Sequence, residues 1–157
     1  VIRLTADRPR SVTFTARLSR PGKMAGVRAE GNQIRMSEHV GNGNGVKMEA
    51  LLRIINSGGH LNSAGDSINV SGADSVTLFI TAATSYRGND PLGSSVSTMD
   101  KISSDDYSSV KKEHIEDYQS LFKRVSIELG SGDGRFFTTD ARVTAMQNGY
   151  VDTDLKL

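Results

Sequence analysis

Short runs in which apolar and polar residues alternate fill the first half of this 157-residue chain. A clear example spans residues 12–18, which read VTFTARL. Alternation with a period of two places one face of a strand in a core and the other face in solvent. Turn-forming pairs such as Pro21-Gly22 and Gly58-Gly59 separate the runs. The pattern predicts about six or seven antiparallel strands, and therefore an antiparallel β-sandwich over residues 1–90.

Two of these runs are apolar on both faces, which is typical of strands in the middle of a sheet. They are residues 46–55 (VKMEALLRII) and residues 75–83 (SVTLFITAA). The glycines at 41–45 (GNGNG) precede the first of them. This segment lacks the Lys-Ser/Thr pair and the glycine spacing of phosphate-binding loops, and a strand follows it rather than a helix. A hairpin turn explains it better.

The chain changes character after residue 90. Residues 105–122 contain a set of side chains spaced three or four residues apart, namely Tyr107, Val110, His114, Tyr118 and Leu121. This spacing predicts a helix with one apolar side. The period then becomes two, which predicts a strand at about 124–129, and a second helix is expected at 140–147. We therefore expect residues 91–157 to form a linker of helices and one strand, with a short helix after Pro91, in a chain that is mainly β and α+β overall.

Composition excludes several classes of function. Nineteen basic and eighteen acidic residues give a net charge of +1, which argues against a surface for nucleic acid. Cysteine is absent, so disulfides and thiolate metal sites are excluded. No run approaches the ~20 apolar residues of a membrane span. The chain begins in a strand-like pattern without Met and stops within a helix-like one, so we expect a piece of a longer protein.

The side chains that could carry chemistry show no convergent pattern. Glu113 and Asp117 are four residues apart on the predicted helix, but both lie off its apolar side and suit a solvated face. The three histidines form no metal-binding pair, and His114 is expected to be a core or interface residue. Phe79 and Tyr86 are weak candidates for a sugar-binding platform. The residues alone therefore predict no catalytic, binding or metal site, and no cofactor.

Several motifs nevertheless occur in a characteristic order. Residues 114–125 read HIEDYQSLFKRV and are followed by Leu129-Gly130. Residues 138–142 read TTDAR, and residues 152–155 read DTDL. Upstream, residues 82–86 read AATSY, with Asp90-Pro91 after them. Together these segments resemble glycoside hydrolase family 95, the inverting α-L-fucosidases. Thr138 departs from the family, which usually has proline there.

This resemblance implies the latter part of an N-terminal β-supersandwich domain, followed by a helical linker into an (α/α)6 catalytic barrel. The family's catalytic groups belong to the barrel, beyond Leu157, so none is carried over to this sequence. The parent enzyme would be secreted or periplasmic. Its partners would be its own catalytic domain and a fucosylated glycan, with no nucleic acid or membrane. The motif residues expected to serve structure or an interface are Thr84, Ser85, His114, Asp117, Tyr118, Arg124, Asp140 and Arg142.

Three hypotheses about function follow. The first is a non-catalytic domain that braces the barrel of a fucosidase-like hydrolase, with ion pairs among Asp117, Arg124, Asp140 and Arg142 fixing the path of the linker. The second is a stand-alone carbohydrate-binding module, which would need a row of exposed aromatic residues. An autonomous enzyme is the third. We also expect self-association, because apolar surface would be left bare.

Overall fold

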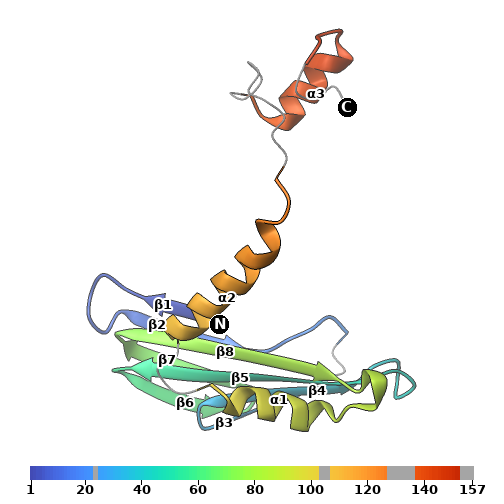
Figure 1. Cartoon of the computed structure of the whole chain (residues 1–157). Helices are drawn as coiled ribbons and strands as arrows, with labels where there is room; N and C mark the ends of the chain where they lie inside the picture. The colour runs from blue at the N-terminus through green and yellow to red at the C-terminus, as the bar shows by residue number, and fades with distance from the viewer. Residues whose placement is uncertain (23–24, 103–106, 127–136, 153–157) are drawn as a thin grey trace. The chain divides into compact units, whose positions relative to one another are not determined.

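A computed structural model describes residues 1–22, 25–102, 107–126 and 137–152 of the chain. The chain divides into two compact units, Val1–Ile115 and Glu116–Leu157, and each is described by itself. The first unit holds the β-sheets, and Figure 1 shows its strands in blue to green.

The first unit is built on two antiparallel sheets. A five-stranded sheet has the order β1-β8-β5-β4-β3, and a three-stranded sheet has the order β2-β7-β6. The strands are β1 (Ile2–Thr5), β2 (Val12–Arg17), β3 (Gly26–Glu30), β4 (Gln33–His39), β5 (Lys47–Ser57), β6 (His60–Ala64), β7 (Ser67–Ala73) and β8 (Ser75–Thr84). The predicted antiparallel sandwich is confirmed. The two runs that are apolar on both faces form β5, at the centre of the larger sheet, and β8 beside it.

The main core lies between the two sheets. Strands β4, β5 and β8 contribute side chains from one layer, and β2 and β7 contribute them from the other. Its buried members are Val12, Ala16, Ile34, Leu52, Ile54, Ile68, Val70, Ala73 and Val76. Each fully buried Val, Leu or Ile side chain stabilises the fold by roughly 1.5–3 kcal/mol, so this layer holds the sandwich together.

A second core lies on the other face of the larger sheet, beneath helix α1 (Pro91–Asp100). Leu51, Phe79 and Met99 are buried there. Arg53 of β5 donates from Nη1 to the Met99 carbonyl oxygen (3.1 Å) and from Nη2 to Asp100 Oδ1 (3.0 Å), which places a cation at the end of the helix. The proposed platform residue Phe79 is therefore a core residue. The interpretation of Phe79 as a sugar platform is wrong.

Helix α2 (Tyr107–Phe122) forms where the three- and four-residue spacing predicts it. Its first turns are attached to the first unit: Val110 packs against the second core, and the Arg3 guanidinium carbon lies 5.4 Å from the centre of the Tyr107 ring. Between Tyr107 and Phe122, no residue of α2 is buried. His114 is exposed, so the expectation of a core histidine is wrong and its interface role stays a prediction.

The remaining elements are short. A 3-10 turn, η1 (Tyr86–Gly88), follows β8, and helix α3 (Thr139–Gln147) lies in the second unit. The strand expected at 124–129 does not include residues 124–126, and the rest of it lies outside the described residues. The helix expected from Asp152 falls outside them as well, apart from Asp152 itself. None of the described helices is long and apolar enough to cross a membrane.

Candidate functional site

The motif Thr84-Ser85-Tyr86 ends β8 and ties it to the start of β5. Ser85 Oγ accepts a hydrogen bond from the Lys47 amide (2.9 Å), and the Ser85 amide donates to the Lys47 carbonyl oxygen (2.8 Å). Thr84 Oγ1 accepts from the Tyr86 amide over a longer distance of 3.4 Å. These bonds use the small hydroxyl side chains to close a turn, so they act on the backbone rather than on a ligand.

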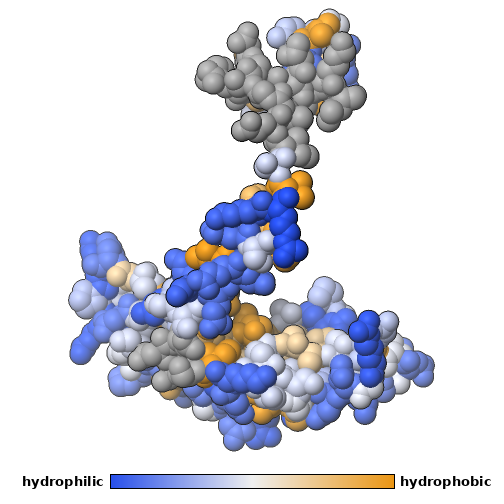
Figure 2. Space-filling view, viewed as in Figure 1, coloured by the Kyte–Doolittle hydropathy of each residue, from blue (hydrophilic) through white to orange (hydrophobic). Residues whose placement is uncertain are grey.

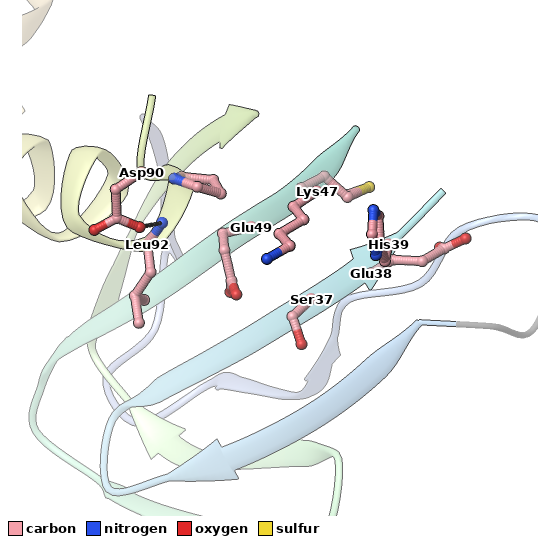
Figure 3. Close-up of a pocket in the computed structure, with 9 residues that line it drawn as sticks. Ser37, Glu38, His39, Lys47, Glu49, Asp90 and Leu92 are labelled. Atoms are coloured by element: carbon pink, nitrogen blue, oxygen red, sulfur yellow. Dashed lines mark hydrogen bonds between the residues drawn. The ribbon is translucent and has the colours of Figure 1, made fainter. Parts of the chain in front are cut away.

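Asp90 caps the N-terminus of α1. Its Oδ1 accepts from the Leu92 amide at 3.2 Å and its Oδ2 from the Gly93 amide at 3.0 Å, and Pro91 occupies the first turn, where no amide proton is needed. Figure 3 shows the bond between Asp90 and Leu92. Both carboxylate oxygens of Asp90 therefore accept hydrogen bonds from free amides of the helix.

Removing this cap should destabilise the first unit. We expect Asp90→Ala to lower the free energy of unfolding by about 0.5–2 kcal/mol, because two helix amides lose their acceptor. Urea denaturation followed by circular dichroism would measure it. Asp90→Asn keeps an oxygen acceptor and should cost much less. Equal stability of the Asp90→Ala variant and the wild type would contradict the capping role.

A depression of about 400 Å³ lies between this cap and the ends of β4 and β5. Ser37, Lys47 and Glu49 project from one side of the larger sheet, as Figure 3 shows. The register explains this, because Ser37 pairs with Glu49, and Lys47 lies two residues before Glu49 on the same strand. Glu38 pairs with Met48 instead and so points to the opposite face. Glu38 and Glu49 therefore point to opposite faces of the larger sheet.

Each carboxylate around the depression has a structural partner. Glu49 accepts two hydrogen bonds from Arg35, from Nε at 2.8 Å and from Nη2 at 2.6 Å, and these bonds raise the pKa of Arg35 above its ordinary value. Glu38 forms an ion pair with Arg20 Nη1 at 2.9 Å. With Asp90 holding α1, these acids form no pair that could protonate a leaving group and activate a water. The charged groups around the depression therefore hold the fold together.

The histidines do not converge. The Nε2 atom of His39 lies 3.0 Å from the Gly45 carbonyl oxygen, within the glycine-rich turn, while His60 begins β6 and His114 lies on α2. Among the described residues, no group of His, Asp and Glu could hold a metal ion.

In the second unit, a bidentate ion pair joins Arg142 of α3 to Asp152. Arg142 Nε and Nη2 each donate to one carboxylate oxygen at 2.6 Å. The side chains are 15% and 3% exposed, respectively. Gly149, at φ +90°, ends the helix and reverses the chain, which brings Asp152 back against Arg142. This bidentate pair fixes the segment that follows α3 onto the helix.

Asp140 lies in the first turn of α3. Thr138 occupies the N-cap position, but its side chain accepts no hydrogen bond from the first turn. Its hydroxyl instead bonds to the Asp140 carboxylate, and this bond, with the backbone amides of Asp140 and Ala141, lowers the pKa of Asp140 below its ordinary value of 3.8. Asp140 therefore supplies negative charge to the positive end of the helix.

A titration tests this arrangement. Thr138→Val should raise the pKa of Asp140 toward 3.8, because the largest stabilising bond to the carboxylate is removed. Since the pKa in the folded chain is lowered, the contribution of Asp140 to stability is present above the unfolded pKa and is lost as pH falls through the folded one. Carboxyl-detected NMR titration would measure the change, with Thr139→Val as the matched control. An unchanged pKa in Thr138→Val would contradict the bond.

The other predicted site residues make local contacts. Arg124 Nε donates to the Ser120 carbonyl oxygen at 2.8 Å, and the Asp117 carbonyl oxygen accepts from Ser120 Oγ at 2.7 Å. The Tyr118 ring stacks on Phe122 with a centroid distance of 5.2 Å. These contacts join residues that are close together in the chain. Sequence reasoning missed Glu49 and Asp152 as ion-pair partners, because their contacts depend on strand register and on the turn at Gly149.

Comparison with protein families adds the decisive observation. Residues 1–89, more than half of the chain, match the glycosyl hydrolase family 65 N-terminal domain. This chain belongs to the family of glycosyl hydrolase family 65 N-terminal domains. Residues 106–157 match the glycosyl hydrolase family 95 catalytic domain. No curated protein matches the chain. The prediction of a glycoside hydrolase with an N-terminal β-sandwich is confirmed, whereas the α-L-fucosidase activity remains a prediction.

Proposed function

We propose that this chain is the N-terminal sandwich and the first part of the catalytic domain of an inverting α-L-fucosidase of glycoside hydrolase family 95. The sandwich braces the catalytic barrel and does not itself break bonds. The parent enzyme is secreted or periplasmic and acts on fucosylated glycans. The match of residues 106–157 to the family 95 catalytic domain supports this proposal, together with the order of motifs from Thr84 to Asp152.

The observation that carries the bracing role is the exposed apolar surface of residues 107–126 and 137–152. Large hydrophobic side chains in this region are exposed: Ile115, Tyr118, Leu121, Phe122, Val125, Phe137, Val143, Met146, Tyr150 and Val151. Figure 2 shows hydrophobic side chains, in orange, at the surface along α2. Large apolar side chains exposed in such number mark an interface. The rest of the catalytic domain is the partner that this surface fits.

The chemistry of inverting hydrolysis agrees with a sandwich that braces and a barrel that breaks the bond. Inverting hydrolysis needs a carboxylic acid and a carboxylate about 6.5–9.5 Å apart, with a water between the carboxylate and the sugar. Within the described residues, the acids that line the depression, Glu38, Glu49 and Asp90, are all engaged by structural partners. The proposal therefore places the acid and the base on the remainder of the catalytic domain.

The test uses an enzyme in which this chain is continued by the remainder of a family 95 catalytic domain. It should hydrolyse 4-nitrophenyl α-L-fucopyranoside, and proton NMR should show the β-anomer of fucose as the first product. Hydrolysis of other aryl glycosides but not of the fucoside would refute the substrate assignment, and the α-anomer as first product would refute inversion.

The bracing role has its own test in the same enzyme. Phe122→Ser replaces an exposed ring of α2 and should lower the melting temperature of the whole enzyme, since an interface loses apolar contact. Tyr86→Ser, which changes an exposed ring of the first unit outside the matched catalytic segment, is the control. If the two variants melted together with the wild type, α2 would not be an interface.

A further inference from the structure

The sequence contains three Asn-Gly pairs, at residues 42–43, 44–45 and 148–149. The first two lie in the loop between β4 and β5, and the third follows α3. Glycine has no Cβ to shield its backbone nitrogen, so this nitrogen can approach the side chain of the asparagine before it. The asparagine of each pair is also exposed to solvent. The sequence alone makes the three pairs equivalent, whereas their hydrogen bonds distinguish them.

The pair Asn42-Gly43 forms the centre of a tight turn. The Asn44 amide donates to the Gly41 carbonyl oxygen at 3.1 Å. Both central residues have a positive φ, 54° for the asparagine and 90° for the glycine. This is the pattern of a type I′ turn, in which Asn-Gly is favoured. The turn lies beyond the ladder of β4 and β5, which ends at His39, so it can open while the ladder stays intact.

The two pairs of this loop differ in how firmly the glycine amide is held. The Gly43 amide donates to the His39 carbonyl oxygen at 3.3 Å, which is longer than a usual N–H···O hydrogen bond. The Gly45 amide donates to the Val40 carbonyl oxygen at 2.8 Å. The longer bond is the weaker one, so the Gly43 amide is released at a lower free energy than the Gly45 amide.

The third pair is held at both of its groups. The Gly149 amide donates to the Met146 carbonyl oxygen at 3.0 Å. The Asn148 side-chain amide donates to the Thr144 carbonyl oxygen at 3.0 Å. Both acceptors belong to the last turn of α3, so the asparagine side chain is directed at the helix rather than at the amide that follows it. Of the three pairs, Asn42-Gly43 is the least restrained.

We propose that Asn42 is a site of spontaneous deamidation. When the turn opens, the Gly43 backbone nitrogen loses its proton to a solvent base and attacks the side-chain carbonyl carbon of Asn42. A C–N bond forms, the bond from that carbon to the side-chain nitrogen breaks, and ammonia leaves after taking a proton from solvent. The product is a cyclic succinimide. Water then opens the ring at either of its carbonyl groups and yields aspartate or isoaspartate, with no oxidation or reduction.

The modification changes both the charge and the backbone of the loop. Each conversion adds one negative charge, so the formal net charge falls from +1 to zero. Isoaspartate also lengthens the main chain by one carbon within a turn that requires two positive φ angles. Ion-exchange chromatography would therefore separate the modified chain as a more acidic form.

Ageing of the folded 157-residue chain in mildly alkaline buffer tests this proposal. Tryptic peptide 36–47 contains the first two pairs, and tryptic peptide 143–156 contains the third. Tandem mass spectrometry of these peptides would locate the mass increase that accompanies replacement of an amide by a carboxyl group. Asn42 should convert at least about threefold faster than Asn44 and Asn148. Conversion of Asn44 or Asn148 as fast as that of Asn42 would overturn the proposal.

The unfolded chain and two variants provide the controls. In concentrated urea, where the hydrogen bonds of the turn and the helix are lost, the three sites should react within about twofold of one another. The same preference for Asn42 in urea as in buffer would show that the fold does not select the site. Asn42→Gly tolerates a positive φ and should abolish the first acidic form, whereas Asn44→Gly should retain it. Persistence of that form in Asn42→Gly would also overturn the proposal.

Discussion

Arg142→Ala is expected to destabilise the second unit by about 3–5 kcal/mol. The substitution leaves the Asp152 carboxylate, which is 3% exposed, without the guanidinium that donates two hydrogen bonds to it. A buried charge without its partner pays the cost of lost hydration. Hydrogen exchange of the α3 amides, measured by NMR, would report the loss directly.

Two further substitutions make this test specific. Arg17→Ala breaks an exposed pair, with Arg17 Nε 4.0 Å from Asp66 Oδ1, and should cost less than about 1 kcal/mol. The double change Arg142→Met and Asp152→Leu removes both charges and should recover much of the stability that Arg142→Ala loses. Protection of the α3 amides that was the same in Arg142→Ala and in Arg17→Ala would show that the buried pair does not hold the segment.

Phe79→Ala is expected to lower the free energy of unfolding of the first unit by about 3–5 kcal/mol. Phe79 is 2% exposed and packs with Leu51 and Met99 beneath α1, so its loss leaves a cavity that the surrounding strands cannot close. Chemical denaturation followed by circular dichroism would measure the change in midpoint, with slope compared between variants.

The neighbouring residue supplies a matched control. Ile80 lies on the opposite face of β8 and is 49% exposed, so Ile80→Ala should change stability by about 0.5 kcal/mol or less. Comparison of the two alanine variants separates the effect of burial from the effect of strand propensity, because Phe and Ile both favour strands. If the two alanine variants unfolded at the same denaturant concentration, the core beneath α1 would not exist as described.

Much of the first unit could be predicted from its sequence, because period-two alternation and turn residues act locally. The alternation in residues 12–18 predicted a strand nearly where β2 lies, and the apolar run at 46–55 predicted the central strand β5. The packing of α1 on the sheet could not be read in the same way. Its sheet-facing side carries Ser95 as well as Met99, and a serine in a buried position weakens the hydrophobic period of the helix.

The candidate site was less predictable, for a physical reason. The partnership of Arg142 with Asp152 spans ten residues and depends on the chain reversal at Gly149, which fixed helical spacings do not reveal. Likewise, Arg35 and Glu49 meet through the register of β4 and β5. The motifs did indicate the correct class of enzyme, because their order along the chain reflects the family rather than any contact.

Purified 157-residue chain incubated with 4-nitrophenyl α-L-fucopyranoside provides the most direct test of the division between bracing and bond-breaking. The expected rate of nitrophenol release equals that of buffer alone, because the three acids that line the depression, Glu38, Glu49 and Asp90, are engaged by structural partners. Turnover above that background, abolished by Glu49→Gln, would show that the sandwich itself is the enzyme and would contradict the account.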